Sequence, residues 1–244
     1  MSAVRRRLAF VRTAGPGRGL TVRSRAMLLG LMGLLVLAGC SDSAKDLASS
    51  DPQARVQTIR VLAAGGGDAA AERVASVARH EDTATATEAI VALGRMSSDR
   101  AVDALAEVAM KEERAALRQL AVTALSQHKT AKSVETFRQV VGHDPVPEVR
   151  AAAAMGLATQ GGMDDVPLLV EAAGAETDLA ATRSEVTAMG AILGVYFPND
   201  PNDPPEVRQE NLARTRDAAD HLYKVRKGLL PQDMQCGNMP GGGR

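Results

Sequence analysis

The chain has 244 residues, enough for one large or two small domains, and its 29 basic and 29 acidic residues give a formal charge of zero. Hydrophobic residues make up 45% but aromatic residues only 2%, and much of the apolar fraction is alanine, the strongest helix former. No clear runs of β-branched residues alternate with polar ones, so the composition excludes a sheet-based fold and predicts an all-α class.

The N-terminal segment is typical of an export signal. Residues 1–25 carry seven arginines and no acidic residue, and residues 26–38 form the uncharged run AMLLGLMGLLVLA. A membrane span needs about 20 apolar residues, so this run is too short to be one but suits the apolar region of a secretory signal. It ends in Leu37-Ala38-Gly39-Cys40, which is followed by the polar stretch SDSAKD.

This ending resembles the lipobox of bacterial lipoprotein signal peptides, in which Leu stands three residues before an invariant Cys. The resemblance implies cleavage after Gly39 and attachment of several acyl chains at Cys40, which together anchor a protein stably to a membrane. Residues 1–39 are then a signal peptide, and residues 40–50 are the lipidated cysteine and a flexible tether. Two alternatives stay open: an ordinary secretory signal with an incidental cysteine, and a twin-arginine signal suggested by the segment RRRLAF.

Removal of the signal changes the charge of the chain. Seven of the basic residues and none of the acidic ones lie in residues 1–39, so 22 basic against 29 acidic residues remain, a formal charge of −7. An acidic protein with few aromatic residues is a poor nucleic-acid binder, and we expect no nucleic-acid partner. Cys236 is the only other cysteine, which excludes an internal disulfide in the lipidated chain and leaves a free thiol or a bond between chains.

From Asp51 onward the apolar residues repeat with a period of 31 or 32 residues. One register, in the first helix of each unit, comprises Leu62, Leu93, Leu125, Leu157 and Met189. A second register, in the second helix, comprises Val74, Leu105, Phe137 and Leu169. Two registers with one period predict four helix pairs and a divergent fifth unit, in which each pair covers the apolar flank of the next.

The units resemble short HEAT repeats of the phycobilisome-lyase-like type. The shared pattern is an acidic or Asp-Pro start, Val-Arg, an alanine-rich helix, a Gly/Asp turn and a second apolar helix, and DPVPEVRAAAAMGLA (Asp144 to Ala158) matches it best. Arg55, Arg118 and Arg150 hold the arginine position, where the second unit has Ala86. The resemblance implies an α-solenoid of four to five helix hairpins over residues 51–195.

Glycines and cations mark the expected helix ends. The turns GGGD (Gly65 to Asp68) and QGGMD (Gln160 to Asp164) are expected to use the positive φ of glycine. His80, Lys111 and His143 occupy one repeat position, which we place in the last turn of each second helix, where a cation complements the helix dipole. His128 is expected to end a first helix in the same way. This account needs no metal ion at these histidines.

The C-terminal part departs from the repeat. After a long first helix near residues 176–195 comes the proline-rich stretch FPNDPNDPPE, which forbids helix. A further long helix is predicted over residues 205–227, with Pro205 in its first turn. We therefore expect residues 196–230 to form a loop and a cap helix for the solenoid, and residues 231–244 to be a disordered tail.

The chemistry of the sequence favours binding over catalysis. It contains no HExxH, no paired cysteines, no phosphate-binding glycine loop and no GxSxG, so we expect no enzymatic activity, no metal and no cofactor. The outward positions of the second helices instead form a mostly acidic row, here called the acidic ladder: Glu72, Asp103, Glu107, Glu135, Gln139 and Glu171. In HEAT-like stacks the second helices line the concave side, so the resemblance implies a surface for a basic or polar partner. The alternative is an ordinary solvated helix face.

These features predict a lipid-anchored protein-interaction scaffold on the periplasmic face of a bacterial envelope, with the inner or outer membrane left open and no small-molecule substrate evident. Two alternatives remain. One is an enzyme or enzyme accessory, because similar repeats occur in chromophore lyases. The other is a permanent subunit or assembly factor of an envelope complex.

Overall fold

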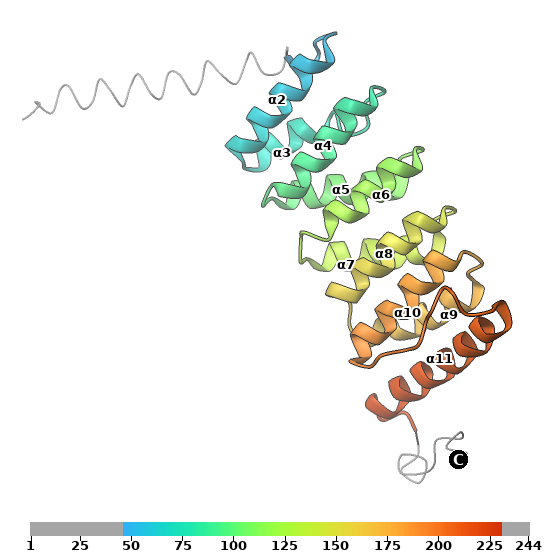
Figure 1. Ribbon diagram of the computed structural model, residues 1–244. Coiled ribbons are helices and arrows are strands. Elements are labelled where there is room, and N and C mark those ends of the chain that lie inside the picture. Colours follow the sequence, from blue (N-terminus) through green and yellow to red (C-terminus); the bar gives the residue numbers. More distant parts are fainter. Residues whose placement is uncertain (1–45, 231–244) are drawn as a thin grey trace, which may run out of the picture. The chain divides into compact units, whose positions relative to one another are not determined.

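The computed structural model describes residues 46–230, and in them the helices follow one another as hairpins (Figure 1). Four hairpins come first: α2 (Pro52–Gly65) with α3 (Asp68–Ala75), α4 (Thr83–Arg95) with α5 (Asp99–Lys111), α6 (Ala115–Leu125) with α7 (Ala131–His143), and α8 (Pro147–Gln160) with α9 (Val166–Ala175). A short 3₁₀ helix, η1 (Met163–Asp165), precedes α9. Two single helices follow: α10 (Leu179–Leu193) and α11 (Pro205–Arg226).

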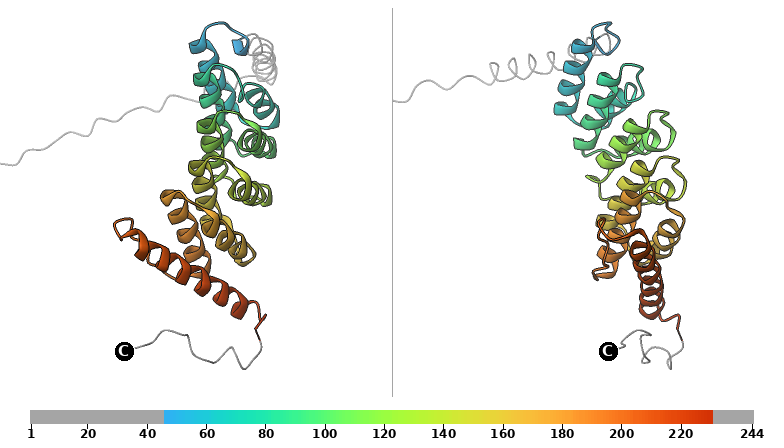
Figure 2. Two further views of the ribbon diagram at one scale, coloured as in Figure 1. Left: turned by 90° about the vertical axis from the view of Figure 1, so that its right-hand side faces the viewer. Right: turned by 45° about the vertical axis from the view of Figure 1, so that its right-hand side comes forward.

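The hairpins stack so that their helices form two layers. Each of the first helices α2, α4, α6, α8 and α10 contacts the next in that series, and the second helices α3, α5, α7 and α9 do the same. The long helix α11 packs against α9 and α10 at the end of the stack (Figure 2). This arrangement confirms the predicted all-α class and the predicted solenoid of helix hairpins.

The aligned apolar residues form the core that joins the hairpins. In both registers they have no exposed surface from the second hairpin onward: Leu93, Leu125, Leu157, Met189, Leu105, Phe137 and Leu169. A single apolar cluster runs from Leu47, before α2, to Ala219 in α11. Leu62 is only half-buried, because among the described residues no hairpin precedes the one to which it belongs. The core is therefore continuous along the stack.

Local sequence signals set the helix starts. The carboxylates of three residues accept hydrogen bonds from first-turn backbone amides: Asp51 for α2, Asp82 for α4 and Asp178 for α10. Prolines stand in the first turn of three helices: Pro52, Pro147 and Pro205. Their fixed φ suits a helix start, and their missing amide hydrogen costs no helical hydrogen bond there.

The two glycine turns use glycine for different reasons. Gly66 and Gly67 have φ of 65° and 82°, as predicted for the turn after α2. The prediction of a positive φ is wrong for the turn after α8, where Gly161 has φ −71°. A Cβ at Gly161 would instead lie 2.6 Å from the carbonyl oxygen of Leu157 and 2.9 Å from Oδ2 of Asp165. Space, and not backbone conformation, requires glycine there.

The helix α11 spans nearly the range predicted from its prolines and its basic end. It buries Thr215 and Ala219, and Nε of Arg216 donates to the carbonyl oxygen of Val170 in α9 at 3.1 Å. Among the helices of residues 46–230, none combines the length and the apolar character that a membrane crossing requires.

The register makes a direct prediction about stability. Leu93→Ala or Leu125→Ala should each lower the free energy of unfolding by about 2–5 kcal/mol, because each empties a fully buried leucine site. Val61→Ala is the matched control in α2: its side chain is 70% exposed, so the change should stay within about 0.5 kcal/mol. Chemical denaturation measures all three. Equal stabilities of Leu93→Ala and Val61→Ala would refute the register.

Candidate functional site

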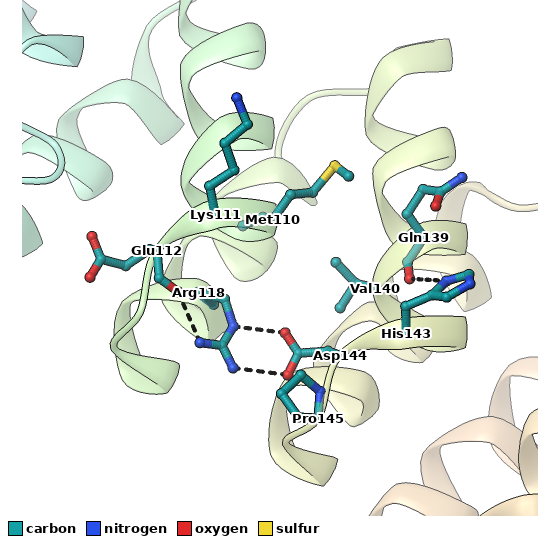
Figure 3. Close-up of a pocket in the computed structure, with 10 residues that line it drawn as sticks. Met110, Lys111, Glu112, Arg118, Gln139, Val140, His143, Asp144 and Pro145 are labelled. Atoms are coloured by element: carbon teal, nitrogen blue, oxygen red, sulfur yellow. Dashed lines mark hydrogen bonds and ion pairs between the residues drawn. The ribbon is translucent and has the colours of Figure 1, made fainter.

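An arginine in the first helix ties consecutive hairpins together. Nη1 of Arg118 in α6 donates to the carbonyl oxygens of Glu112 and Glu113, both at 2.9 Å, in the loop before its own helix. Its Nε and Nη2 donate to the carboxylate of Asp144, before α8, at 2.7 and 3.0 Å (Figure 3). The two side chains are 9% and 5% exposed. This is a bidentate, charge-assisted pair almost shielded from water, and we call the arrangement the arginine bridge.

The first hairpin has the same bridge. Nη1 of Arg55 in α2 donates to the carbonyl oxygen of Ser49 at 2.5 Å, and its Nη2 donates to Oδ2 of Asp82 at 2.9 Å. The hydroxyl of Thr85 and then the guanidinium of Arg55 lower the pKa of Asp82 well below its ordinary value, since both donate to the ionised carboxylate. The bridge therefore holds Asp82 in its charged form.

The fourth hairpin has the third bridge. Nη1 of Arg150 in α8 donates to the carbonyl oxygen of Asp144 at 2.7 Å, and its Nε donates to Oε2 of Glu176 at 2.8 Å. Burial raises the pKa of Glu176, but hydrogen bonds from the Asp178 amide and from Arg150 outweigh it, so the pKa is lowered overall. In all three bridges an arginine joins a carbonyl six residues before it to a carboxylate 26 or 27 residues after it.

The second hairpin completes its bridge with an arginine from elsewhere in the sequence. Ala86 stands at the arginine position of α4. Nη2 of Arg114, just before α6, donates to the carbonyl oxygen of His80 at 3.0 Å, and its Nε donates to Oε1 of Glu112 at 2.7 Å. His80 and Glu112 lie six residues before and 26 residues after Ala86. Arg114 thus joins the same two groups that an arginine at position 86 would join.

Pockets accompany the bridges at the ends of the second helices. One of about 250 Å³ lies at the ends of α5 and α7 beside Arg118 (Figure 3). Another of about 540 Å³ lies one repeat further on, at the ends of α7 and α9 beside Arg150. We call the second one the α9 pocket. Its lining includes Gly142, Asp144, Arg150, Glu171, Glu176 and Glu185.

Smaller side chains explain why the α9 pocket is the larger of the two. Three side chains that line the pocket beside Arg118 are Met110, Val140 and His143. At the equivalent positions, 32 residues later, the α9 pocket is lined by Gly142, Ala172 and Ala175. The repeat geometry is the same, and the missing side-chain atoms leave open space.

Glu185 in α10 is an unpaired carboxylate on the wall of the α9 pocket. The residue has no exposed surface, and neither of its carboxylate oxygens has a hydrogen-bond partner within residues 46–230. The equivalent positions in the three preceding hairpins hold Ala89, Ala121 and Ala153, all fully buried. In α10, therefore, a carboxyl group occupies a place that those repeats fill with a methyl group.

The surroundings of Glu185 disfavour its negative charge. Burial, followed by the negative charge of Glu176, raises its pKa to about 7, while the positive charge of Arg150 acts in the opposite direction. The group therefore changes its charge near neutral pH. A buried titratable group with a strongly shifted pKa beside a pocket is a candidate functional residue.

The acidic ladder lies on the exposed side of the second helices, and all six of its residues are exposed. Part of its charge is compensated. Glu107 pairs with Arg79 of the preceding hairpin and with Lys111, both at 3.3 Å. Glu135 accepts a hydrogen bond from the side-chain amide of Gln139 at 3.1 Å. The ladder is thus a mixed polar row that is most acidic where its carboxylates lack such neighbours.

Glu171 is the ladder residue that the structure brings to the α9 pocket. It is exposed, and it has no ion pair within residues 46–230. The ladder and Glu185 were separate features in the sequence, and the fold places them in the lining of one pocket. The predicted lipid-attachment residue, Cys40, lies outside the described residues, as does Cys236.

The cations at the helix ends fit the prediction at two of three positions. Lys111 and His143 lie in the last turns of α5 and α7. The prediction is wrong for His80, because α3 ends at Ala75 and tight turns with i to i−3 hydrogen bonds follow. His80 instead supplies the carbonyl oxygen of the second bridge.

His128 also differs from the prediction, because α6 ends before it. Its Nε2 lies 3.2 Å from the carbonyl oxygen of Leu93 near the C-terminus of α4, so it satisfies the end of a neighbouring helix. Within the part of the chain that the structure describes, no group of three or more His, Cys, Asp or Glu side chains is arranged to hold a metal ion.

Sequence reasoning missed two residues of the site. Glu185 left a readable signal, since the aligned register has alanine in the three preceding hairpins and glutamate here. Arg114 left none, because it stands outside the repeat position whose arginine it replaces.

Arg114 should stabilise the joint between the second and third hairpins. Arg114→Ala should lower the free energy of unfolding by about 1.5–3 kcal/mol, because it leaves the nearly buried carboxylate of Glu112 without its guanidinium. The double variant Ala86→Arg/Arg114→Ala should recover part of that loss by restoring the repeat position. Arg100→Ala, an exposed arginine of α5, is the control. Equal effects of Arg114→Ala and Arg100→Ala in chemical denaturation would contradict the bridge.

Glu185 should make stability depend on pH in a known direction. Its carboxyl group keeps a proton in the folded state up to about pH 7, whereas the unfolded chain loses it above the ordinary pKa of 4.5. The free energy of unfolding should therefore fall as pH rises from 4.5 to 7, by about 3 kcal/mol in total. Glu185→Ala should remove this fall and exceed the wild type in stability at pH 8. Parallel stability-versus-pH curves for the two proteins would refute the assignment.

The comparison with known families agrees with this geometry. A family model for HEAT repeats matches residues 44–125 and 102–190, which together make up more than half of the chain and span α2 to most of α10. No curated protein matches the chain. The match confirms the resemblance inferred from the repeat pattern. The chain belongs to the HEAT-repeat family.

Proposed function

We propose that the chain is a protein-interaction scaffold, anchored by lipid to the periplasmic face of a bacterial envelope. The observation that carries the scaffold function is the HEAT-repeat stack from α2 to α10. Stacked repeats present a long continuous surface made of many similar units, which suits the binding of another protein.

The exposed side of the second helices is the surface we assign to the partner. Glu72, Asp103 and Glu171 carry no ion pair within residues 46–230, so their charges are available to a partner. An acidic row favours association with a basic surface and selects against acidic partners. The expected partner is therefore a protein with a basic or polar face.

The anchor is supported by the sequence around Cys40. An arginine-rich start, a short apolar run, Leu37-Ala38-Gly39-Cys40 and a polar exit resemble a lipoprotein signal. Acyl chains on Cys40 would hold the repeats near a membrane through the short polar stretch before α2. Export also agrees with the formal charge of −7 that remains after cleavage.

We further propose that the protein acts by binding and not by catalysis, because its sequence has none of the catalytic motifs considered above. A permanent subunit of an envelope complex would differ from a scaffold only in the lifetime of its contacts. Affinity capture from solubilised membranes distinguishes a stoichiometric partner from a bound chromophore, which the lyase-like alternative requires.

The lipid anchor has a direct test. Cells grown with a clickable palmitate analogue should label the wild-type chain, and Cys40→Ala should abolish the label and release the protein from the membrane fraction. Cys236→Ala is the matched control and should stay labelled and membrane-bound. A labelled Cys40→Ala variant would refute lipidation at this residue.

The partner surface is tested by charge reversal. Asp103→Lys together with Glu107→Lys should reduce recovery of the partner in affinity capture at least tenfold, because the centre of the acidic ladder becomes basic. Glu148→Lys with Glu210→Lys reverses two exposed charges outside the ladder and should leave recovery unchanged. Circular dichroism confirms that both variants are folded. Equal recovery from both would overturn the assignment of this surface.

A further inference from the structure

The charges around the α9 pocket do not balance. Asp144 is fully engaged by Arg118, and Glu176 by Arg150. Two lining carboxylates remain, Glu171 at the exposed surface and Glu185 in the wall, and neither has a cationic partner within residues 46–230. A pocket with two uncompensated carboxylates attracts a positive charge, and a buried one gains most from meeting it.

The pocket also has room for a ligand that its counterpart lacks. Gly142, Ala172 and Ala175 open it to about 540 Å³, against about 250 Å³ beside Arg118. The smaller pocket has Ala153 at the position equivalent to Glu185. Extra space and an extra carboxylate therefore occur at the same place in the stack. This coincidence points to a bound group, because neither change improves the packing of the repeat.

We propose that the α9 pocket receives the basic side chain, lysine or arginine, of a protein partner. The proposal rests on the scaffold function and names the chemistry of one contact within it. The cationic head group pairs with Glu171 and Glu185, and its methylene stem lies along Leu168 and Ala172. Binding includes a rotation of the Glu185 side chain toward the ligand, since its oxygens are covered when the pocket is empty.

A protein side chain fits better than a metal ion. The described residues hold no group of three or more side chains arranged for a metal. The pocket is instead deep on one side, open on the other, and continuous with the exposed second helices that form the partner surface. A side chain projecting from a partner on those helices would enter it directly.

The contact should strengthen as pH rises. The charged groups that face Glu185 are Arg150 of α8, Glu176 after α9, and the pocket residues His143, Asp144 and Glu171. A cation binds the ionised form of Glu185, and with a pKa of about 7 the ionised fraction rises about 30-fold from pH 5.5 to 8. His143 loses its positive charge over the same range, so a His143→Gln variant is needed to separate the two contributions.

The test uses the full chain in detergent and defined peptides as probes. Binding of Ac-Gly-Gly-Lys-Gly-Gly-NH₂, its arginine analogue and its norleucine analogue is followed by NMR. We expect the lysine or the arginine peptide to bind and the norleucine peptide, which lacks the charge, not to bind. n-Butylamine is a fourth probe: binding as tight as that of the lysine peptide would assign the pocket to free amines and overturn the partner side chain.

Variants locate the site. Glu185→Gln and Glu171→Gln should each weaken peptide binding at least tenfold, and Glu185→Gln should abolish most of the pH dependence that His143→Gln retains. Glu107→Gln is the matched control, because Glu107 holds the register position of Glu171 two repeats earlier. Should Glu185→Gln not fold, Glu171→Gln at the exposed surface still decides. Unchanged binding in Glu171→Gln would overturn the proposal.

The outcome is separable from that of the proposed function. Peptide binding to the purified chain requires neither the natural partner nor the lipid anchor. Partner recovery that persists when no charged peptide binds would refute the pocket alone. Loss of the scaffold function would show instead as failed partner capture by the wild-type chain.

Discussion

The joints between hairpins depend on the arginine bridge. Each hairpin contacts only its neighbours, so the apolar flanks stay covered only while consecutive hairpins keep their spacing and angle. The bridge fixes both, because one guanidinium binds a loop carbonyl on one side and a nearly buried carboxylate on the other. Buried charges are stable only as complete pairs. That constraint explains why a hairpin without its own arginine has Arg114 in the same place.

The same constraint gives meaning to Glu185. At the three joints with their own arginine and at the joint closed by Arg114, every nearly buried carboxylate meets a guanidinium. Glu185 lies beside a completed bridge and adds a carboxylate that the bridge cannot serve. A cost of this kind in a repeat otherwise built from alanine is typical of a functional position. The binding surface and the stability of the stack therefore meet at one pocket.

The sequence predicted the fold well because both helices of each hairpin carry their own period. Leu93 and Phe137 are buried as the two registers require, and Pro205 opens the last helix. What the sequence could not show depends on distances across the fold. Arg114 replaces an arginine 28 positions away, and Gly161 is needed for space that only the neighbouring carbonyl and carboxylate define. Glu185 was visible in the register, but its lack of a partner requires the packed structure.

The charge state of the buried carboxylates tests this account most directly. Carbon-13 NMR of the glutamate carboxyl groups, followed from pH 3 to 9, reports each of them separately. The account predicts one glutamate that titrates near pH 7 and disappears from the spectrum of Glu185→Ala, while Glu112 and Glu176 titrate below the ordinary value of 4.5. A spectrum in which every glutamate titrates between pH 4 and 5 would contradict both the completed bridges and the unpaired carboxylate.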